Sequence, residues 1–311
     1  MHRLEFLREK EKRLLSEIYE GYESAFERLT VAEIEGIVGR RLRVKATASA
    51  ENLKAAERDL RWLSGLEGFV VASDDERYPP LLREIYDPPF LLFGRGVERL
   101  RAIPIAVVGT RYPTGKAYRA CFELSRYLSS KGVCVVSGLA RGIDATAHAG
   151  ALAGGGQTAA VLGNGIDTVY PAENRRLAQK IVENGGVILS EFPPGTEVRK
   201  YRFPQRNRII SGISPLSIVV QAPEKSGALI TADQALEQGR DVVVLSAGLE
   251  DVYGDGTVRL AEQGAPVWEE PQDIDCWLQR YEEIYGKEHK NEGKEKNDAD
   301  YCRISGQGAD H

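Results

Sequence analysis

Short apolar runs alternate with amphipathic stretches without interruption from residue 103 onward. Near-continuous apolar runs predict strands buried on both faces, which are typical of a parallel sheet covered by helices. The expected strands are Ile105–Val108, Val133–Val136, Thr158–Leu162, Val187–Leu189, Leu216–Val220, Asp241–Leu245 and Ala265–Trp268. The expected helices are Lys116–Ser130, Ile143–Ala153, Ala172–Asn184, Arg206–Ser211, Thr231–Gln238 and Pro271–Tyr285. The alternation predicts an α/β fold with a doubly wound, mostly parallel sheet.

The first 64 residues have a helical pattern instead. Apolar residues spaced for one buried helix face are Leu4, Leu7, Leu14, Leu15 and Ile18. Glycines expected to interrupt the helices are Gly21, Gly36 and Gly39. Thr30 is followed three positions later by Glu33, which is the pattern of a capping box. We therefore expect a small helical module before the sheet.

Residues 65–102 follow neither pattern. Proline pairs at 79–80 and 88–89 prevent a helix from continuing, because proline lacks the backbone donor and restricts the residue before it. We expect two short extended pieces around one helical turn near Leu81–Ile85. Beyond residue 286 the chain is polar and charged and has almost nothing to bury, so we expect it to be disordered.

Charge and cysteine content limit the function classes. The net charge is -5, so a nucleic-acid site must depend on a local basic patch and not on the whole molecule. The four cysteines form no C-x-x-C pair, which favours free thiols in a reducing cytoplasm over disulfides or metal ligands. The charged N-terminal residues lack the apolar core of a signal peptide, and no run is long enough to span a bilayer.

Glycine-rich loops follow most of the predicted strands. In a doubly wound sheet, ligands bind at the carboxyl ends of the strands, and glycines there let the backbone approach a phosphate. The Ser137–Asp144 turn leads from a strand into a helix and is the strongest example, although any α/β domain can use such a turn as a plain connection. The candidate residues in these loops are Gly109, Thr110, Arg111, Ser137, Gly138, Arg141, Gly142, Gly163, Asn164, Ser226 and Gly227. The spacing is not G-x-G-x-x-G, which disfavours a dinucleotide site.

A basic segment runs from Arg199 to Arg208. It contains five basic residues, two aromatic residues and no acid. Such a segment can neutralise successive phosphates while Tyr201 or Phe203 stacks on a base, which suits single-stranded nucleic acid. The alternative is a solvated basic turn with Phe203 packed inward. The candidates here are Lys200, Phe203, Arg206, Asn207 and Arg208.

Several linked motifs in order resemble the bacterial DNA-processing protein A family (DprA, also called Smf). The resemblance covers residues 66–273 and rests on segments that include Val107-Val-Gly-Thr-Arg111, Val136-Ser-Gly-Leu-Ala-Arg-Gly-Ile-Asp144, Leu162-Gly-Asn-Gly-Ile-Asp-Thr-Val-Tyr-Pro171 and Phe203-Pro-Gln-Arg-Asn-Arg-Ile-Ile-Ser-Gly212. Members are similar in having an extended Rossmann-like domain that binds single-stranded DNA, forms a homodimer and loads RecA recombinase during natural transformation. The resemblance implies DNA contacts by Arg111, the Ser137-Gly138 turn, Lys200, Phe203, Arg206 and Arg208. The sequence contains no metal-binding cluster, and we predict no cofactor and no metal.

The chain departs from the family pattern in two places. Leu245-Ser-Ala-Gly248 stands where the family usually has Val-Pro-Gly, and Gly256-Thr-Val-Arg-Leu-Ala261 stands for Gly-x-Asn-x-Leu-Ile. The resemblance implies that this region lies near the surface the family uses for dimerisation and recombinase contact, so the departures bear on those two activities and not on DNA binding.

The resemblance and the patterns together predict the domain organisation. We expect a helical, SAM-like module at 1–64, a connector packing on the main domain at 65–102, a Rossmann-like single-stranded DNA-binding domain at 103–285 and a disordered polar tail at 286–311.

A related enzyme class has to be weighed against binding. Rossmann-like phosphoribohydrolases that cleave nucleoside monophosphates resemble Pro-Gly-Gly-x-Gly-Thr-x-x-Glu where this chain has Glu224–Asp233, so the catalytic glutamate is unmatched. An acid such as Asp233 in the first helical turn needs no catalytic role. His148 is expected to be packed or exposed and not a general base, and Asp144 to cap or orient its turn. We therefore predict a binding protein and no catalytic residue, with a phosphoribohydrolase or a mononucleotide sensor as the alternative.

Overall fold

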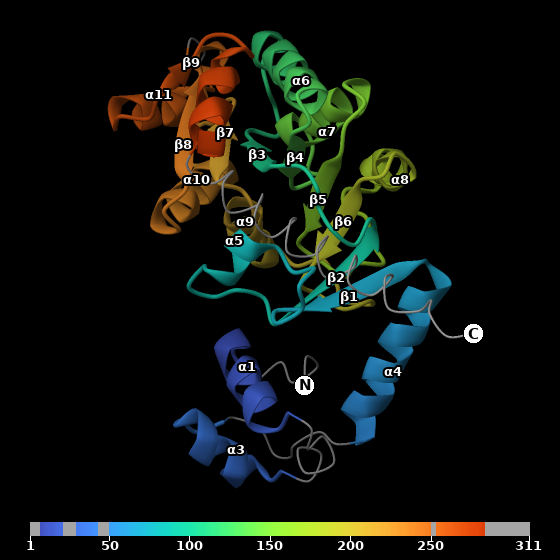
Figure 1. Ribbon diagram of the computed structural model, residues 1–311. Coiled ribbons are helices and arrows are strands. Elements are labelled where there is room, and N and C mark those ends of the chain that lie inside the picture. Colours follow the sequence, from blue (N-terminus) through green and yellow to red (C-terminus); the bar gives the residue numbers. More distant parts are fainter. Residues whose placement is uncertain (1–6, 21–28, 43–49, 250–252, 284–311) are drawn as a thin grey trace, which may run out of the picture. The chain divides into compact units, whose positions relative to one another are not determined.

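The computed structural model describes residues 7–20, 29–42, 50–249 and 253–283. Its centre is a nine-stranded sheet in the order β1-β2-β6-β5-β4-β3-β7-β8-β9, coloured from light blue to red in Figure 1. The strands from β3 to β9 pair in parallel with one another, whereas β2 pairs antiparallel with β1 and with β6. The predicted α/β class with an extended, doubly wound, mostly parallel sheet is therefore confirmed.

The strands agree with the apolar runs to within a residue or two. They are β1 (Gly68–Ala72), β2 (Leu91–Gly96), β3 (Pro104–Val108), β4 (Cys134–Ser137), β5 (Thr158–Leu162), β6 (Val187–Ser190), β7 (Leu216–Val219), β8 (Asp241–Leu245) and β9 (Val267–Trp268). Every residue of β4, β5, β6 and β7 is buried, as expected of strands with helices on both faces.

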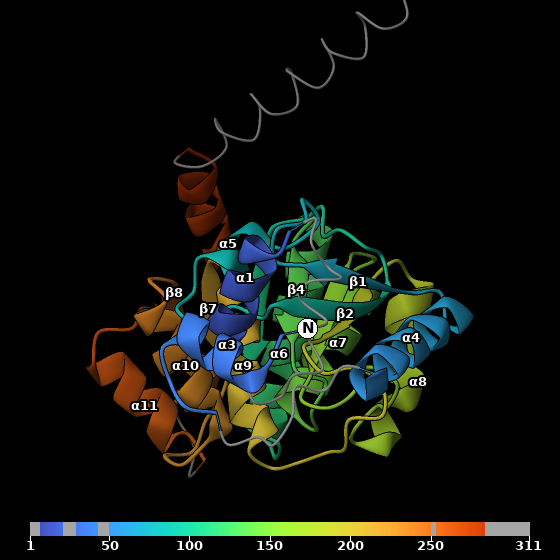
Figure 2. The ribbon, with the colours of Figure 1, turned by 90° about the horizontal axis from the view of Figure 1, so that it is seen from below.

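Helices cover both faces of the sheet. On one side lie α6 (Gly115–Ser130), α7 (Ile143–Ala153) and α8 (Arg175–Glu183), which follows the short helix η1 (Ala172–Asn174); on the other lie α5 (Pro80–Arg83), α9 (Arg202–Ile213) and α10 (Gly227–Glu237) (Figure 1). Right-handed crossovers produce this division, because the chain moves outward from β3 to β6 and then returns to continue from β7 in the other direction. Helices α9 and α10 pack side by side, as Figure 2 also shows. The short helix η2 (Ser246–Gly248) and helix α11 (Asp255–Glu262) follow β8.

Two helices begin earlier than their sequence pattern predicts. Helix α9 begins at Arg202 instead of Arg206, and α10 begins at Gly227 instead of Thr231. Pro204 lies in the first turn of α9, where the backbone N–H groups need no helical partner, so it does not end the helix. Ser226 caps α10 by accepting a hydrogen bond from Ala228 N. Because α9 begins at Arg202, Phe203 is part of this helix.

The connector is part of the sheet. Its two extended pieces form β1 and β2, and its helical turn forms α5, as predicted. The sequence does not predict how these pieces join the sheet. Strand β2 pairs antiparallel with β6, the outer strand of the parallel part, with Phe93 opposite Ser190. This edge of the sheet therefore ends in an antiparallel ribbon.

The N-terminal residues form α1 (Glu9–Ile18), α3 (Val31–Val38) and α4 (Ala50–Gly65). The predicted capping box is present, with Glu33 N donating to Thr30 Oγ1 and Thr30 N donating to Glu33 Oε2. Gly39 ends α3 with a φ of 69°, whereas Gly36 lies inside that helix, so the break predicted there is wrong. The predictions at Leu4 and Gly21 lie outside the described residues.

The buried face of the first helix is narrower than predicted. Leu7 and Leu15 are buried with Leu29, Ile34 and Leu42. Leu14 and Ile18 are exposed. The predicted placement of those two residues on the buried face is therefore wrong, and the packed stripe of α1 is narrow.

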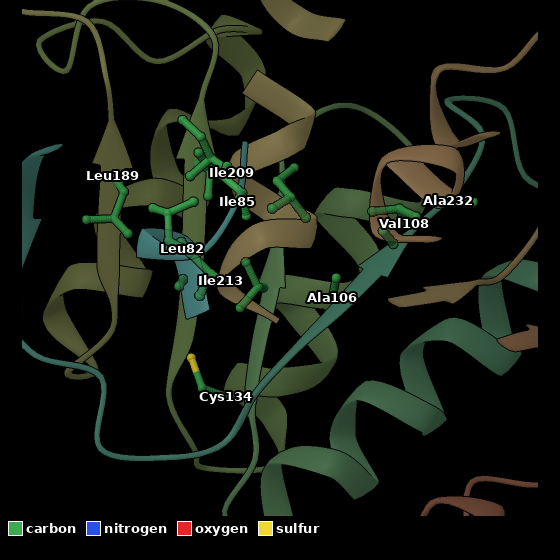
Figure 3. Packing of buried hydrophobic residues seen from close by; sticks show 14 of the residues in the cluster. Leu82, Ile85, Ala106, Val108, Cys134, Leu189, Ile209, Ile213 and Ala232 are labelled. Atoms are coloured by element: carbon green, nitrogen blue, oxygen red, sulfur yellow. The ribbon is translucent and has the colours of Figure 1, made fainter. Parts of the chain in front are cut away.

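One large apolar cluster of the described residues lies between the sheet and the helices α5, α9 and α10. Figure 3 shows Ile209 and Ile213 of α9 packing towards Leu82 and Ile85, with Ala106, Val108, Cys134 and Leu189 contributed by strands. Cys134 and Cys121 are buried free thiols, and burial raises the pKa of Cys134 to about 12. Burying these side chains removes α9 from solvent along one face and fixes the position of its first turn at the end of the sheet.

The chain divides into two compact units, residues 1–269 and 270–311. In the second unit, residues 273–283 are helical, in agreement with the predicted last helix as far as the structure describes it. The predicted polar tail at 286–311 lies outside the described residues. None of the helices in the described ranges combines the length and the apolar character needed to cross a membrane.

His148 of α7 is buried in the interior and is not a surface group. Its Nδ1 lies 2.7 Å from Thr158 Oγ1, which donates to Val135 O, so the ring nitrogen must be the donor to that hydroxyl. Burial, together with the positive charge of Arg206, lowers the pKa of His148 to about 3. This packed role agrees with the prediction that His148 is no general base.

The buried imidazole predicts a loss of stability in acid. From about pH 6.5 down to about pH 3 the unfolded chain binds a proton that the folded chain does not, so stability should fall with pH at up to about 1.4 kcal/mol per unit. His148→Asn retains a donor to Thr158 without a titrating group. We expect its urea midpoint to depend less on pH in this window than that of the unmodified protein.

Two other buried groups have the opposite effect on the pH dependence of stability. Comparing the unmodified protein with His148→Asn cancels their contributions. The pKa values of Asp144 and Glu191 are raised by burial, so their contributions to stability fall as pH rises from their ordinary values. Both carboxyls are present in the two proteins, and the difference in midpoint therefore isolates His148. Parallel curves for the two proteins would contradict the prediction.

Candidate nucleic-acid interface

The carboxyl ends of the parallel strands form one edge, where the glycine-rich loops meet the first turns of the helices. Strand β3 lies between β4 and β7, so the chain reverses its direction of travel across the sheet at β3 and β7. In open α/β sheets ligands bind at this switch point. The loops after β3, β4, β5, β6 and β7 all reach this edge and contain the predicted site residues.

Gln221 ties together the two loops at the switch point. Its carbonyl oxygen accepts from Thr110 N at 2.7 Å, and its side-chain Oε1 accepts from Thr114 N at 2.9 Å. Gln221 is fully buried, so these bonds are protected from water. The loop carrying Arg111 is therefore fixed to the end of β7, a connection that the sequence analysis did not identify.

The Ser137–Asp144 turn is occupied by its own carboxylate. Asp144 is buried, and its Oδ2 accepts a hydrogen bond from Ala140 N at 3.4 Å. Ile143 N, another amide at the start of α7, donates to Thr110 O at 3.1 Å. The amides that we expected to meet a phosphate are thus directed at groups of the protein, and Asp144 orients the turn.

Glycine is required here for contact between loops. Gly142 has a φ of 73°, and a Cβ at that position would lie 2.4 Å from Thr110 O. A Cβ at Gly109 would lie 2.6 Å from the Ile143 side chain. These two glycines let the loops after β3 and β4 touch each other directly.

Arg206 lies beneath the turn and is not at the surface. The residue is 5% exposed, and its Nη1 donates to Gly138 O at 2.8 Å and to Val161 O. A Cβ on Gly138 would lie 2.4 Å from the guanidinium, so glycine makes room for the arginine. Arg206 therefore joins the first half of α9 to the ends of β4 and β5.

The charges of Arg206 and Asp144 partly compensate one another. Burial lowers the pKa of Arg206 to about 10, against the opposing effect of Asp144. Burial likewise raises the pKa of Asp144, against the opposing effect of Arg206. The guanidinium remains charged at neutral pH, and each group makes burial of the other less costly.

Arg208 also faces the interior of its loop region. Its Nη2 donates to Glu191 Oε2 at 2.7 Å, and its Nε lies 3.6 Å from Asp87 Oδ2. Burial raises the pKa of Glu191, and the charge of Arg208 opposes that rise. Arg208 is thus engaged in ion pairs that hold the loop after β6.

Several other predicted residues are buried and hold the loops in place. Asn164 donates to Thr168 O at 2.6 Å, and Asn207 donates to Gly227 O at 3.1 Å. Ser137 donates to Val107 O at 2.7 Å. Their hydrogen bonds fold the edge, and the surface is left to other predicted residues.

One cluster does present basic and aromatic groups at the surface. The guanidinium carbon of Arg111 lies 5.9 Å from the centroid of the Phe203 ring, a distance typical of a cation–π contact. The ring of Tyr170 also contacts Phe203; the ring centroids are 5.8 Å apart, and the angle between the rings is 37°. Gly163 completes the cluster, because a Cβ there would lie 2.9 Å from the Phe203 ring. We call Arg111, Phe203 and Tyr170 the aromatic platform.

Tyr170 was not among the predicted site residues. The sequence contained a signal for it, since Tyr170 belongs to the same glycine-rich loop as Gly163 and Asn164. Nothing in the local pattern shows that its ring meets a phenylalanine more than thirty positions away, because that contact depends on where α9 begins.

Three of the predicted cations are exposed. Arg111 and Lys200 are exposed, and so is Arg141, which forms an ion pair with Glu173 at 2.7 Å. Of the predicted basic residues, these three are accessible to a ligand, whereas Arg206 and Arg208 serve the interior. No group of histidine, cysteine and acidic side chains suited to a metal ion occurs in the described ranges.

Comparison with known proteins agrees with the motifs. The family described as DNA recombination-mediator protein A matches residues 69–278. The DNA processing protein DprA of Bacillus subtilis is 44% identical over 212 residues, which cover 68% of this chain and 70% of that protein.

Solved structures extend the agreement to the fold. The X-ray structure of DNA processing protein A from Streptococcus pneumoniae is similar with a TM-score of 0.72 at 34% identity, covering 88% of this chain and 95% of that one. DNA processing protein A from Helicobacter pylori, whose structure is described as giving insights into a unique single-stranded DNA binding mode, has a TM-score of 0.62 at 30% identity, covering 70% of this chain and 98% of that one. With the ordered motifs and the shared sheet, these matches show that the chain belongs to the DNA recombination-mediator protein A family.

Proposed function

We propose that this protein binds single-stranded DNA across the carboxyl edge of its sheet and has no catalytic activity of its own. The observation that carries the proposal is the contact of Arg111 with Phe203 at 5.9 Å, which places a cation and an aromatic ring together at the surface. The cation can pair with a phosphate, and the ring can stack on an unpaired base. The single-stranded DNA binding described for the Helicobacter pylori relative supports the same ligand.

The predicted site residues take two kinds of role in this proposal. Arg111, Arg141, Lys200 and Phe203 contact the strand. The other predicted residues shape the loops that carry these contacts, either through buried hydrogen bonds and ion pairs or by leaving space for close approach: Gly109, Thr110, Ser137, Gly138, Gly142, Gly163, Asn164, Arg206, Asn207, Arg208, Ser226 and Gly227.

We propose that the bound strand is passed to RecA recombinase during recombination of incoming DNA, as in natural transformation. Membership of a recombination-mediator family supports this step. We also propose a cytoplasmic location, in keeping with the unpaired thiols of Cys121 and Cys134.

A symmetric dimer through residues 249–265 is a further part of the proposal. Tyr253 before α11 is exposed, as are the apolar residues Ile230 and Leu236 of α10 and Val267 of β9. Thr257 stands at a variable position of the Gly-x-Asn-x-Leu-Ile pattern; it is buried, and its hydroxyl accepts from Ala222 N at 2.7 Å, so it serves the inside of the protomer. The exposed groups around it remain available for an isologous contact.

The function is tested by comparing polymers with monomers. Affinity for oligo-dT should increase with length up to the span of the edge, because each nucleotide adds a phosphate and a stacking face. Nucleoside monophosphates should bind weakly and should release no free base. The measurements are fluorescence anisotropy of strands from a few to several tens of nucleotides and an assay of free base with each monophosphate.

An enzyme would give the opposite result. Asp233 is exposed and is the acid nearest to the unmatched glutamate position. Its predicted place in the first helical turn is wrong, because α10 begins at Gly227 and Asp233 lies beyond the first turn. Release of base that disappears in Asp233→Asn, together with affinity that does not depend on length, would show a phosphoribohydrolase. Tight binding of a monophosphate without turnover would show a mononucleotide sensor.

The contribution of the exposed cation is tested with Arg111→Ala. We expect affinity for any strand sequence to fall roughly 5- to 30-fold, or about 1–2 kcal/mol, because a phosphate contact is lost and Phe203 loses the guanidinium that lies over its ring. The slope of log affinity against log salt should decrease by about 0.7. Arg126→Ala removes an exposed guanidinium from the middle of α6, where it pairs with Glu123, and should leave binding unchanged.

A buried arginine provides the contrast in the same experiment. Arg206→Ala leaves two carbonyls and Asp144 without their partner and should cost about 3–5 kcal/mol of stability.

Wild-type affinity and salt slope in a folded Arg111→Ala protein would contradict the assignment of the site.

The dimer is tested by sedimentation. Two edges on one particle should give long strands an avidity that short strands lack. We expect a dimer at micromolar concentration in the presence of a long oligonucleotide, and weaker association in Leu236→Glu. A monomer under both conditions would contradict the dimer and would leave strand binding unaffected.

A further inference from the structure

We propose that single-stranded DNA continues from the aromatic platform onto a second basic and aromatic surface, on the loop before α6 and the first two turns of that helix. The inference rests on the proposed binding of single-stranded DNA and extends it to residues that neither the motifs nor the Arg199–Arg208 segment includes. These residues, which we call the α6 patch, are Tyr112, Lys116, Tyr118 and Arg119.

The sequence around the α6 patch has the composition of a strand-binding segment. Residues 109–122 contain three basic residues and two tyrosines, and the first acid is Glu123. Cations can pair with successive phosphates while the rings stack on unpaired bases, as in the Arg199–Arg208 segment. In that segment Arg206 and Arg208 are engaged inside the protein, whereas all three cations of residues 109–122 are exposed. This second stretch therefore offers all its charges at the surface.

Both tyrosines of the α6 patch have exposed ring surface. Tyr112 is 72% exposed and Tyr118 is 50% exposed. Single exposed aromatic residues are common on proteins and need no explanation. Two of them interleaved with exposed cations form the arrangement by which proteins bind single strands without reading their sequence.

The α6 patch is continuous with the proposed binding edge. Arg111 directly precedes Tyr112 in the chain and lies over the Phe203 ring. Glu173 and, more weakly, Tyr112 raise the pKa of Arg141, so the Tyr112 side chain lies close to that exposed cation. A strand that contacts Arg111 therefore has the α6 patch beside it.

The α6 patch is held firmly to the edge. Thr114 caps α6 by accepting from Ala117 N, and its own N–H donates to the buried side chain of Gln221. Helix α6 also packs closely on α7, since a Cβ at Gly150 would lie 2.5 Å from Phe122 O. A preformed surface loses little freedom on binding, so one strand can contact the platform and the patch together.

The rest of α6 shows how a solvated face of the same helix differs. Glu123 and Arg126 are both exposed and pair with each other at 2.6 Å, so their charges compensate. Acids are favoured at the start of a helix, as in α1, α3 and α11, whereas α6 has no acid in its first turn and has Lys116 there. The charge of Lys116 does not stabilise the helix, which favours a role in binding an anion.

The charges are tested with the double variant Lys116→Ala/Arg119→Ala. Both residues are exposed and alanine is the best helix former, so the variant should fold. On oligo-dT of several tens of nucleotides, we expect affinity to fall on the order of tenfold and the slope of log affinity against log salt to decrease by about 1.4, because two phosphate contacts are lost. Oligo-dT of about four nucleotides, which the platform alone can hold, should compete within about twofold as well as it does for the unmodified protein.

Arg126→Ala is the matched control, because it removes an exposed guanidinium from the same helix. We expect it to bind strands of both lengths within about twofold of the unmodified protein. A thermal midpoint close to that of the unmodified protein establishes that each variant is folded.

The stacking contribution is tested with Tyr118→Ala. Loss of one stacked base should lower affinity for the long strand roughly 5- to 150-fold without changing the salt slope. Tyr118→Phe keeps the ring and should bind like the unmodified protein. Equal affinities of Tyr118→Ala and Tyr118→Phe would show that no base stacks there and would overturn the inference.

The outcomes separate this inference from the function on which it rests. If the double variant weakens short and long strands equally, or weakens neither, the α6 patch is not a separate part of the binding surface and the inference is overturned. Loss of affinity in Arg111→Ala would then still support the proposed function. No binding of oligo-dT by the unmodified protein, even at low salt, would overturn both the inference and the proposed function.

Discussion

A single buried charge, that of Arg206, holds the carboxyl edge of the sheet together. Its guanidinium joins α9 to the carbonyls of Gly138 and Val161, which belong to two different strand ends. An ionised group in the interior is tolerated only when it is paired and hydrogen-bonded, and here Asp144 and the two carbonyls meet that requirement. The position of Phe203, three residues earlier in α9, depends on this anchor.

The anchor explains why basic residues at this edge have different roles. Arg206 donates to carbonyls of the protein and Arg208 pairs with a carboxylate, whereas Arg111 and Lys200 are exposed at the surface. Buried ion pairs are costly to break from one side, so the two inner arginines give the loops a defined shape. The outer cations then carry charge on a surface that is already arranged for a ligand.

The sequence predicts the sheet better than it predicts the site. Strands buried on both faces leave an uninterrupted apolar run, and glycine-rich loops after them locate the edge. Charge does not reveal burial, however, and nothing in the Arg199–Arg208 segment shows that Arg206 turns inward. Pro204 made the start of α9 difficult to predict, and with it the contact between Phe203 and Tyr170. The missed features are all contacts between distant loops.

A surface of this kind can discriminate between strands by the state of their bases. Bases in a duplex are stacked on one another, so a ring fixed at the sheet edge can be used only by a strand whose bases are free. The overall charge of -5 opposes nonspecific binding elsewhere on the protein, while the exposed cations of the edge attract phosphates locally. If the edge binds DNA as proposed, a preference for single strands follows from the position of the rings, and no base-specific hydrogen bond is needed to produce it.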